Sequence, residues 1–317
     1  MTVIQQVLLE LDKDYMGRPY YVSGNALYRA IARRVDASAR QSLAVSHGVF
    51  VPGEHGGYPD EHSQSGGAPF FGAGLRPVES YEDLFLFRGA AQRWLSASRP
   101  RDAHNTFDLH VHGGRVAFSP TVQFGLPRQA RKSKRTMTWY VHCYVYDDSE
   151  GSDVVPLDED VLDGLRLGGA RNYGLGETSL KDTQTVDLDA LDYSPLQDAE
   201  GSFELELVSP YVTMSEYPGA DDQSVPWWWT LRPGGVRRRA EQLVEDGEVY
   251  ELETIDHGQV AGYGGPSPVE TAKSGVLRVG THSRFGFGEF RLRPVHEDRV
   301  PERASNAAVR ESVGGER

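Results

Sequence analysis

The sequence predicts an α+β protein made of two similar units, and three observations support this fold class. Strand-like and helix-like segments follow a similar order in both halves of the chain. A glycine-rich segment, LRLGGARNYGLGE at residues 165–177, returns without a gap as LRVGTHSRFGFGE at residues 277–289. Each copy lies between a helix-like and a strand-like segment, which is the expected signature of a duplicated unit.

The first half contains the elements of one complete unit. A strand is predicted at VIQQVLLELD (3–12), and the helical spacing of Ala26, Leu27, Ala30 and Ile31 predicts a helix at 24–35. A hairpin around Gly113–Gly114, an aromatic and β-branched strand, a short helix with acidic residues in its first turn, and a last strand follow at 109–118, 136–147, 156–167 and 177–188.

The second half begins after an acidic, turn-rich linker at 189–202. Its predicted elements are a strand at 203–214, a helix at 233–247, a strand at 248–258, a helix at 267–279 with Ser267 as N-cap, and a strand at 288–295. The order in each half is that of a ferredoxin-like (RRM-like) domain, with the glycine-rich loop before the last strand.

The predicted organisation is therefore two ferredoxin-like domains in tandem, at residues 1–190 and 203–297. The first domain contains a long Gly-, Pro- and His-rich loop at 46–80, and loops of this length are often functional or disordered. Residues 298–317 are polar and without periodicity, so we expect a disordered tail.

The composition leaves several partner classes open. The chain of 317 residues has 46 acidic and 33 basic residues, a net charge of -13, and lysine only at 13, 132, 134, 181 and 273. An acidic, lysine-poor, arginine-rich chain indicates a salt-loving, haloarchaeal character, with an ordinary acidic protein of a GC-rich genome as the alternative. In molar salt the Debye length is only ~3 Å, so the negative charge neither supports nor excludes RNA as a partner.

One cysteine, Cys143, excludes a disulfide framework and a zinc cluster built on several cysteines. We see no apolar run long enough for a membrane helix and no signal peptide, so a cytoplasmic location and no membrane partner are expected. The histidines at 47, 55 and 62, and those at 110 and 112, lack the spacing of a standard metal site. We therefore predict neither a metal nor another cofactor.

The glycine-rich motifs resemble those of a known family. RVGTHSRFGFGE, its copy RLGGARNYGLGE and the opening YYVSGNALYRAIARR are similar to segments of the RAMP superfamily of CRISPR-associated proteins. The resemblance extends over most of residues 1–295 and implies tandem ferredoxin-like domains. It also implies that CRISPR guide RNA and other effector subunits are the partners.

The resemblance implies that both glycine-rich loops contact the RNA backbone, through Gly168, Gly169, Arg171, Gly174 and Gly176 in the first and Gly280, His282, Arg284, Gly286 and Gly288 in the second. Independently of the resemblance, the densest positive patch of this acidic chain predicts phosphate contacts by Arg128, Arg131, Lys132, Lys134 and Arg135. A second basic cluster is formed by Arg237, Arg238 and Arg239.

Two roles are compatible with the resemblance, a non-catalytic effector subunit and a metal-independent endoribonuclease that processes the RNA precursor. In the nuclease, His47 would be the general base, with Tyr28 nearby. No Lys or Arg occurs between Arg40 and Arg76, so the usual charge-stabilising partner is missing. Two glycine-rich loops favour the binding subunit. A tandem ferredoxin-like protein that binds a ligand other than RNA, or acts in metabolism, is a third hypothesis.

Overall fold

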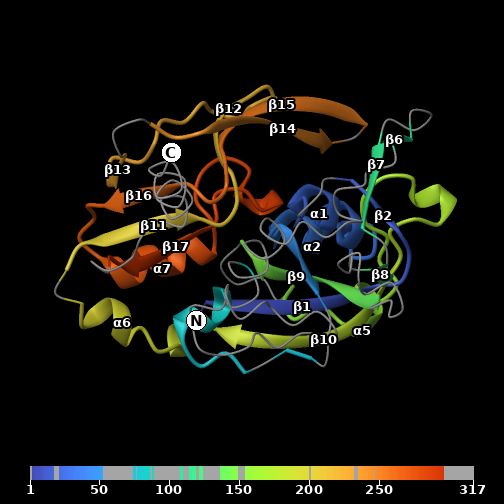
Figure 1. Cartoon of the computed structure of the whole chain (residues 1–317), viewed down its shortest axis with the longest axis horizontal. Coiled ribbons are helices and arrows are strands. Elements are labelled where there is room, and N and C mark those ends of the chain that lie inside the picture. The colour runs from blue at the N-terminus through green and yellow to red at the C-terminus, as the bar shows by residue number, and fades with distance from the viewer. Residues whose placement is uncertain are drawn as a thin grey trace, which may run out of the picture.

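The computed structural model describes residues 2–17, 21–52, 74–75, 77–85, 88, 108–109, 114–118, 121–123, 136–148, 154–199, 201–231, 235–245 and 247–295. These residues form a mixed α+β structure with two units side by side (Figure 1). None of the helices in these ranges is long and apolar enough to cross a bilayer.

The N-terminal unit has the strand order of a ferredoxin-like fold. Its principal strands are β1 (Val3–Leu11), β5 (Gly48–Pro52), β9 (Thr136–Asp147) and β10 (Thr178–Asp187), with α1 (Gly24–Ala32) after β1 and α5 (Glu159–Leu162) before β10. The sheet runs β10-β1-β9-β5, and every neighbouring pair is antiparallel. The last strand thus lies beside the first, and the first beside the third.

Shorter elements extend this unit. The strands β3 (Tyr21–Val22), β4 (Leu43–Val45) and β8 (Thr121–Gln123) join the same sheet, and α2 (Ala37–Ser42) follows α1. A separate sheet contains β2 (Tyr15–Met16), β7 (Gly114–Phe118) and β6 (Asp108–Leu109). Helix α1 begins where the Ser23 hydroxyl accepts a hydrogen bond from the Ala26 amide at 3.3 Å, and it buries Leu27 and Ile31 against the sheet.

The C-terminal unit repeats the strand order with one helix replaced. Its sheet runs β17 (Phe290–Pro294), β11 (Phe203–Leu207), β16 (Val260–Tyr263), β13 (Trp229–Thr230), and α7 (Pro268–Val276) precedes β17. Where the first helix would lie, the described residues between β11 and β13 form β12 (Tyr211–Ser215) instead. This strand pairs with β15 (Glu248–Ile255), which pairs with β14 (Arg238–Glu245).

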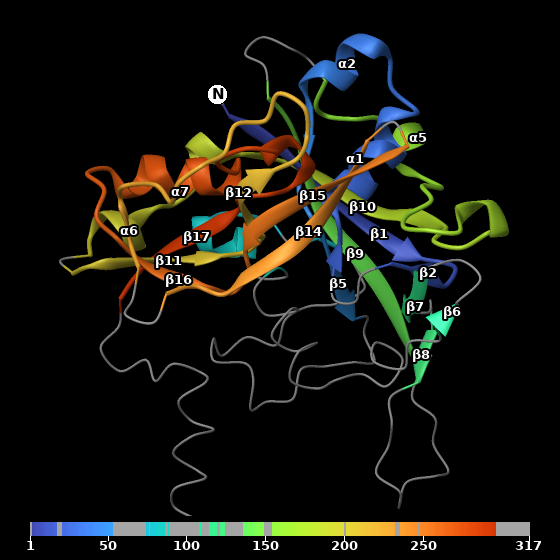
Figure 2. The same cartoon turned by 90° about the horizontal axis from the view of Figure 1, so that it is seen from above.

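The β12-β15-β14 sheet joins the two units. In Figure 2 the β14–β15 hairpin reaches from the C-terminal unit to α1. Leu243 and Leu252 are buried in the same core as Leu27 of α1, and the Arg29 guanidinium donates to the Val244 carbonyl at 3.1 Å. The two units therefore share hydrophobic clusters to which both contribute side chains, and the predicted domain boundaries stay predictions.

Most predicted elements are confirmed, including the strands at β1, β9, β10, β15 and β17 and the helices α1 and α7. The helix predicted at 233–247 is wrong, because β14 occupies 238–245. Alternate residues Glu241 and Leu243 are buried there, and β14 pairs with β15 up to Glu245–Glu248 across Gly247, whose φ is 90°. The Asp246–Gly247 dipeptide is a typical hairpin signal that outweighs the helix formers around it.

Two further boundaries differ from the prediction. The loop predicted at 46–80 begins with a strand, because Val49, Phe50 and Val51 of β5 are buried against β9. The strand predicted at 203–214 is two strands, β11 and β12, interrupted at Ser209–Pro210. Residues 53–73 and the predicted tail 298–317 lie outside the described residues.

Candidate nucleic-acid interface

The two glycine-rich segments fold alike. We call residues 165–177 loop 1 and residues 277–289 loop 2. Each contains one 3-10 turn, η4 (Arg171–Tyr173) in loop 1 and η6 (Ser283–Phe285) in loop 2. The chain enters each turn through a left-handed residue, Ala170 (φ 52°) or His282 (φ 65°), and leaves it through a left-handed glycine, Gly174 (φ 83°) or Gly286 (φ 89°).

The last glycine of each loop is required by a close backbone approach. A Cβ on Gly176 would lie 1.9 Å from the Leu167 carbonyl oxygen, and a Cβ on Gly288 would lie 1.9 Å from that of Val279. The amides of these glycines donate to the carbonyls of Asp14 and Pro210, each at 2.8 Å. The repeated sequence therefore produces a repeated structure, because only glycine can occupy these positions.

Loop 2 is buried between the two units. Phe285 and Phe287 are buried, and a Cβ on Gly24, at the start of α1, would lie 2.2 Å from the Phe285 carbonyl oxygen. A Cβ on Gly286 would lie 2.6 Å from the His47 amide nitrogen. Glycines on both sides thus let the backbones of α1 and the β4–β5 segment approach loop 2.

The side chains of loop 2 bind their own chain. The Arg284 guanidinium donates to the Tyr28 hydroxyl at 2.8 Å and to the Arg40 carbonyl at 2.6 Å, and it stacks over the Tyr28 ring at 5.0 Å. Burial raises the pKa of Tyr28 even though Arg284 opposes this shift. Burial also lowers the pKa of His282 to about 4, so this imidazole is neutral at pH 7. Its Nε2 shares a hydrogen bond with the Ser215 hydroxyl at 2.7 Å.

His47, the predicted general base, lies inside the same joint. This residue is only 3% exposed, and its ring stacks on the Tyr21 ring with 5.0 Å between the centroids. The ring of Phe287 contacts it edge-on, also at 5.0 Å. Tyr28 is likewise buried. The structure therefore brings His47, Tyr28 and loop 2 together, but the imidazole is buried in the interior and is not exposed at the surface.

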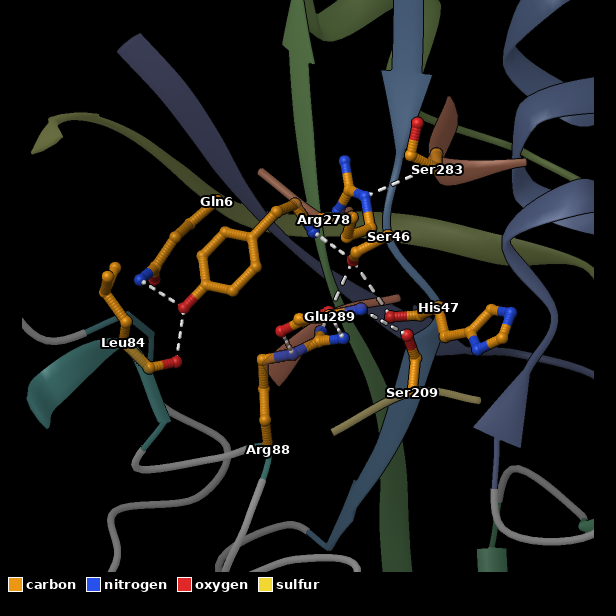
Figure 3. A network of polar contacts seen from close by, with 10 residues as sticks. Gln6, Ser46, His47, Leu84, Arg88, Ser209, Arg278, Ser283 and Glu289 are labelled. Carbon is orange, nitrogen blue, oxygen red and sulfur yellow. Dashed lines mark hydrogen bonds and ion pairs between the residues drawn. The ribbon is translucent and has the colours of Figure 1, made fainter. Parts of the chain in front are cut away.

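A buried ion pair anchors the end of loop 2 (Figure 3). The Arg88 guanidinium donates to both carboxylate oxygens of Glu289, each at 2.6 Å, and both residues are fully buried. The Ser46 hydroxyl lies 3.3 Å from Arg88 Nη1 and accepts from the Tyr144 amide at 2.8 Å. Glu289 is the recurring glutamate of the glycine-rich motif, and in loop 2 it binds an arginine from the first half of the chain.

Loop 1 is open where loop 2 is filled. Among the described residues other than its chain neighbours, no atom lies within 4 Å of a Cβ built on Gly174, the counterpart of Gly286. Tyr173, the counterpart of the buried Phe285, is 66% exposed. Loop 1 therefore presents its turn to solvent at the point where loop 2 presents the same turn to α1.

Arginines from α1 gather near loop 1. Arg29 lies in the last turn of α1, and Arg33, four residues later, is the C-cap with helical φ and ψ, so both lie on the same side of the helix. Partial burial and the like charges of Arg33 and Arg29 lower the pKa of Arg171. Guanidinium groups that repel one another would be stabilised by a bound anion, so Arg29, Arg33 and Arg171 are candidate anion contacts.

The described arginines fall into two groups, those with an ion pair and those without. None of the ion pairs in these ranges involves Arg29, Arg33 or Arg171, and the same holds for Arg34, Arg40, Arg166, Arg278 and Arg284. By contrast, the basic residues of β14 and β17 and the residue before β14 all have carboxylate partners, in the pairs Arg237–Asp256, Arg238–Glu253, Arg239–Glu241, Arg291–Glu82 and Arg293–Glu204. The second basic cluster predicted from the sequence is therefore charge-compensated.

Several predicted site residues are outside the described residues. These are the basic loop with Arg128, Arg131, Lys132, Lys134 and Arg135, and the histidines at 55, 62, 110 and 112. Among the residues that are described, no group of three or more His, Cys, Asp or Glu side chains is arranged to hold a metal ion.

The sequence analysis missed Arg29, Arg33, Arg88, Glu289 and Tyr173. The first two were hidden because a helix places them beside a loop more than 130 residues away, and Arg88 because its partner is 201 residues away. A usable signal existed for Glu289 and Tyr173, since both occupy recurring positions of the glycine-rich motif.

No protein-family model matches the chain, and no curated protein is similar to it in sequence. Among solved structures, it is similar to a CRISPR-associated protein Cas6, with 9% identity, a TM-score of 0.39, and coverage of 93% of this chain and 100% of the other. A Cas6 product complex gives 14% identity, a TM-score of 0.33 and coverage of 93% and 100%. A chain of a Type III-B Cmr-beta complex bound to cognate target RNA gives 10% identity, a TM-score of 0.27 and coverage of 83% and 86%. Likenesses at this level assign the chain neither to a family nor to a function.

Proposed function

We propose that the chain is an RNA-binding protein whose principal backbone-contacting site is loop 1 with the arginines of α1. The observation that carries the proposal is the contrast between two loops of equal backbone geometry. Loop 2 is filled by its own chain, whereas loop 1 is open and lies beside guanidinium groups that have no carboxylate partner among the described residues.

The chemistry of loop 1 suits a phosphodiester backbone. Arginine presents a planar fork of donors that matches phosphate oxygens, and it remains charged at every physiological pH. The open Gly174 lets a bulky backbone approach the turn without meeting a side chain. The chain has a net charge of -13, so arginines that lie beside an open loop without an ion pair among the described residues are positive charges that an anionic polymer would neutralise.

The resemblance of the glycine-rich motifs to the RAMP superfamily suggests which RNA this is. We propose CRISPR guide RNA as the ligand and a non-catalytic subunit of an effector complex as the role. In this role loop 2 acts from inside the protein, by fixing the C-terminal unit against α1 and so setting the position of Arg29 and Arg33.

The alternative is a metal-independent endoribonuclease with His47 as general base. The contact of Arg284 with Tyr28 favours it, because it places a positive charge against the tyrosine that this hypothesis pairs with His47. The burial of His47 disfavours it, since a base must reach the ribose 2′-hydroxyl of its substrate. Incubation of repeat RNA with chelator separates the two, because only the nuclease would cut, and His47→Ala would then abolish cutting while RNA binding survives.

Binding itself is tested by the salt dependence of RNA affinity. Arg33→Gln combined with Arg171→Gln should weaken binding, and the slope of log affinity against log salt should fall by about 0.7 for each lost phosphate contact on single-stranded RNA. The matched control is Lys181→Gln with Arg238→Gln, which removes two positive charges that already have carboxylates nearby. An equal loss of RNA affinity in the control would show that the effect comes from the net charge and not from loop 1. A wild-type protein that binds no RNA at low salt would support the third hypothesis, a ligand other than RNA.

A further inference from the structure

Tyr173 and Phe285 occupy the same position of the repeated loop in opposite environments. Phe285 is 5% exposed, and its ring packs edge-on against the Tyr28 ring at 5.0 Å. The Arg284 guanidinium lies 5.4 Å from the Phe285 centroid. Tyr173 is 66% exposed, so the same rigid turn presents an aromatic ring at the surface.

Loop 2 displays what this turn can hold. Its aromatic residue packs against the planar ring of Tyr28, its own Arg284 places a guanidinium beside that ring, and Gly286 receives a backbone at close range. A nucleotide could make comparable contacts, since its base is a planar ring that stacks on an aromatic side chain and its phosphate binds a guanidinium group. Loop 1 offers an exposed ring in Tyr173 and an open approach at Gly174; Asn172 stands at the position of Arg284, and the arginine of this loop is Arg171, one residue earlier.

We propose that Tyr173 stacks on an unpaired base, so that loop 1 selects single-stranded RNA or an unpaired nucleotide over a continuous duplex. The inference rests on the proposed RNA binding and adds the class of RNA. Within a duplex every base is already stacked, so the Tyr173 ring would have to displace a neighbour, whereas an unpaired base stacks without that loss. A protein segment could also cover an exposed tyrosine, but the arginines beside it favour a ligand that carries negative charge at each repeat.

The rigidity of the turn supports this assignment. The η4 turn is held by hydrogen bonds from the Tyr173 amide to the Ala170 carbonyl at 2.9 Å and from the Gly174 amide to the Arg171 carbonyl at 3.1 Å. A ring on a fixed turn loses little conformational freedom when a base stacks on it, which is the property that makes tyrosine an effective contact residue.

The test compares two RNAs and two variants. Single-stranded oligouridylate and a blunt RNA duplex are titrated against the wild type, Tyr173→Ala and Tyr173→Phe. For the single strand we expect Tyr173→Ala to weaken binding about 5- to 100-fold. Tyr173→Phe should retain wild-type affinity because it keeps the ring. Duplex affinity should change by less than about 2-fold in either variant, since phosphate contacts remain.

Other outcomes overturn the inference in distinguishable ways. If the wild type binds both RNAs but Tyr173→Ala binds the single strand as tightly as the wild type, stacking is refuted and RNA binding stands. If Tyr173→Ala weakens single strand and duplex equally, the residue has no role in selecting unpaired bases. If the wild type binds neither RNA, the proposed function fails and the inference fails with it. Denaturation of each variant confirms that the fold is intact.

Discussion

Loop 1 and loop 2 have the same turn, the same pair of left-handed glycines and the same anchor to the end of a first strand, yet one is open and the other is buried. The difference arises outside the loops. Helix α1 and the β4–β5 segment of the N-terminal unit cover loop 2, whereas in the C-terminal unit β12 takes the place of the corresponding helix. A duplicated motif therefore acquires two functions, a joint inside the protein and a candidate ligand site on its surface.

Substitution of the recurring glutamates should give the largest difference in stability between the two loops. Glu289→Gln leaves the buried Arg88 without a counter-charge, so we expect it to lower the free energy of unfolding by about 3–5 kcal/mol. Glu177→Gln, at the equivalent position of loop 1, should change it by less than about 0.5 kcal/mol. Chemical denaturation measures both. Equal effects would mean that the two loops do not differ as the structure indicates.

Alanine substitution of the glycine at the end of each turn should give a smaller difference in stability between the two loops. Gly174→Ala places a side chain in open space at a left-handed φ, which costs about 1–2 kcal/mol. Gly286→Ala carries the same backbone strain and also presses its Cβ against the His47 amide, which adds about 1–3 kcal/mol. Denaturation midpoints of the two variants check this order, and a larger loss for Gly174→Ala would contradict it.

Of the two loops, only loop 2 contains a histidine, so only loop 2 should contribute a histidine-linked pH dependence of stability. The pKa of His282 is depressed from 6.5 to about 4 by burial, so its contribution to stability is fully present above pH 6.5 and is lost as pH falls toward 4. Because the side chain is only partly buried, we expect a loss of about 1–2 kcal/mol. His282→Ala, which matches Ala170 of loop 1, should remove this part of the pH dependence. An unchanged pH profile in that variant would show that His282 does not titrate in this range.

The sequence predicts the features that depend on local pattern. Alternating or continuous apolar runs identify β1 and β9, and helical spacing identifies α1. The repeated glycines identify two loops that have the same turn in the structure. The strand order follows, because a ferredoxin-like sequence of elements permits few arrangements.

The remaining features depend on contacts between distant segments. Which loop is buried cannot be read from the two similar motifs, because α1 and the β4–β5 segment, which cover loop 2, belong to another part of the chain. The sequence also does not show which basic clusters form ion pairs. Arg237 and Arg238 are paired with carboxylates of β15 and of the residue after it, which tertiary pairing places alongside. Tertiary pairing also converts the segment at 238–245 from predicted helix to strand.

Hydrogen exchange of the two loops in a single sample, with and without RNA, distinguishes their roles within one molecule. If loop 1 is the RNA site and loop 2 the joint, amides in residues 165–177 should exchange more slowly after RNA is added. Those in residues 277–289 should be slow in the free protein and change little. Protection that appears in loop 2 while loop 1 exchanges as before would contradict this assignment.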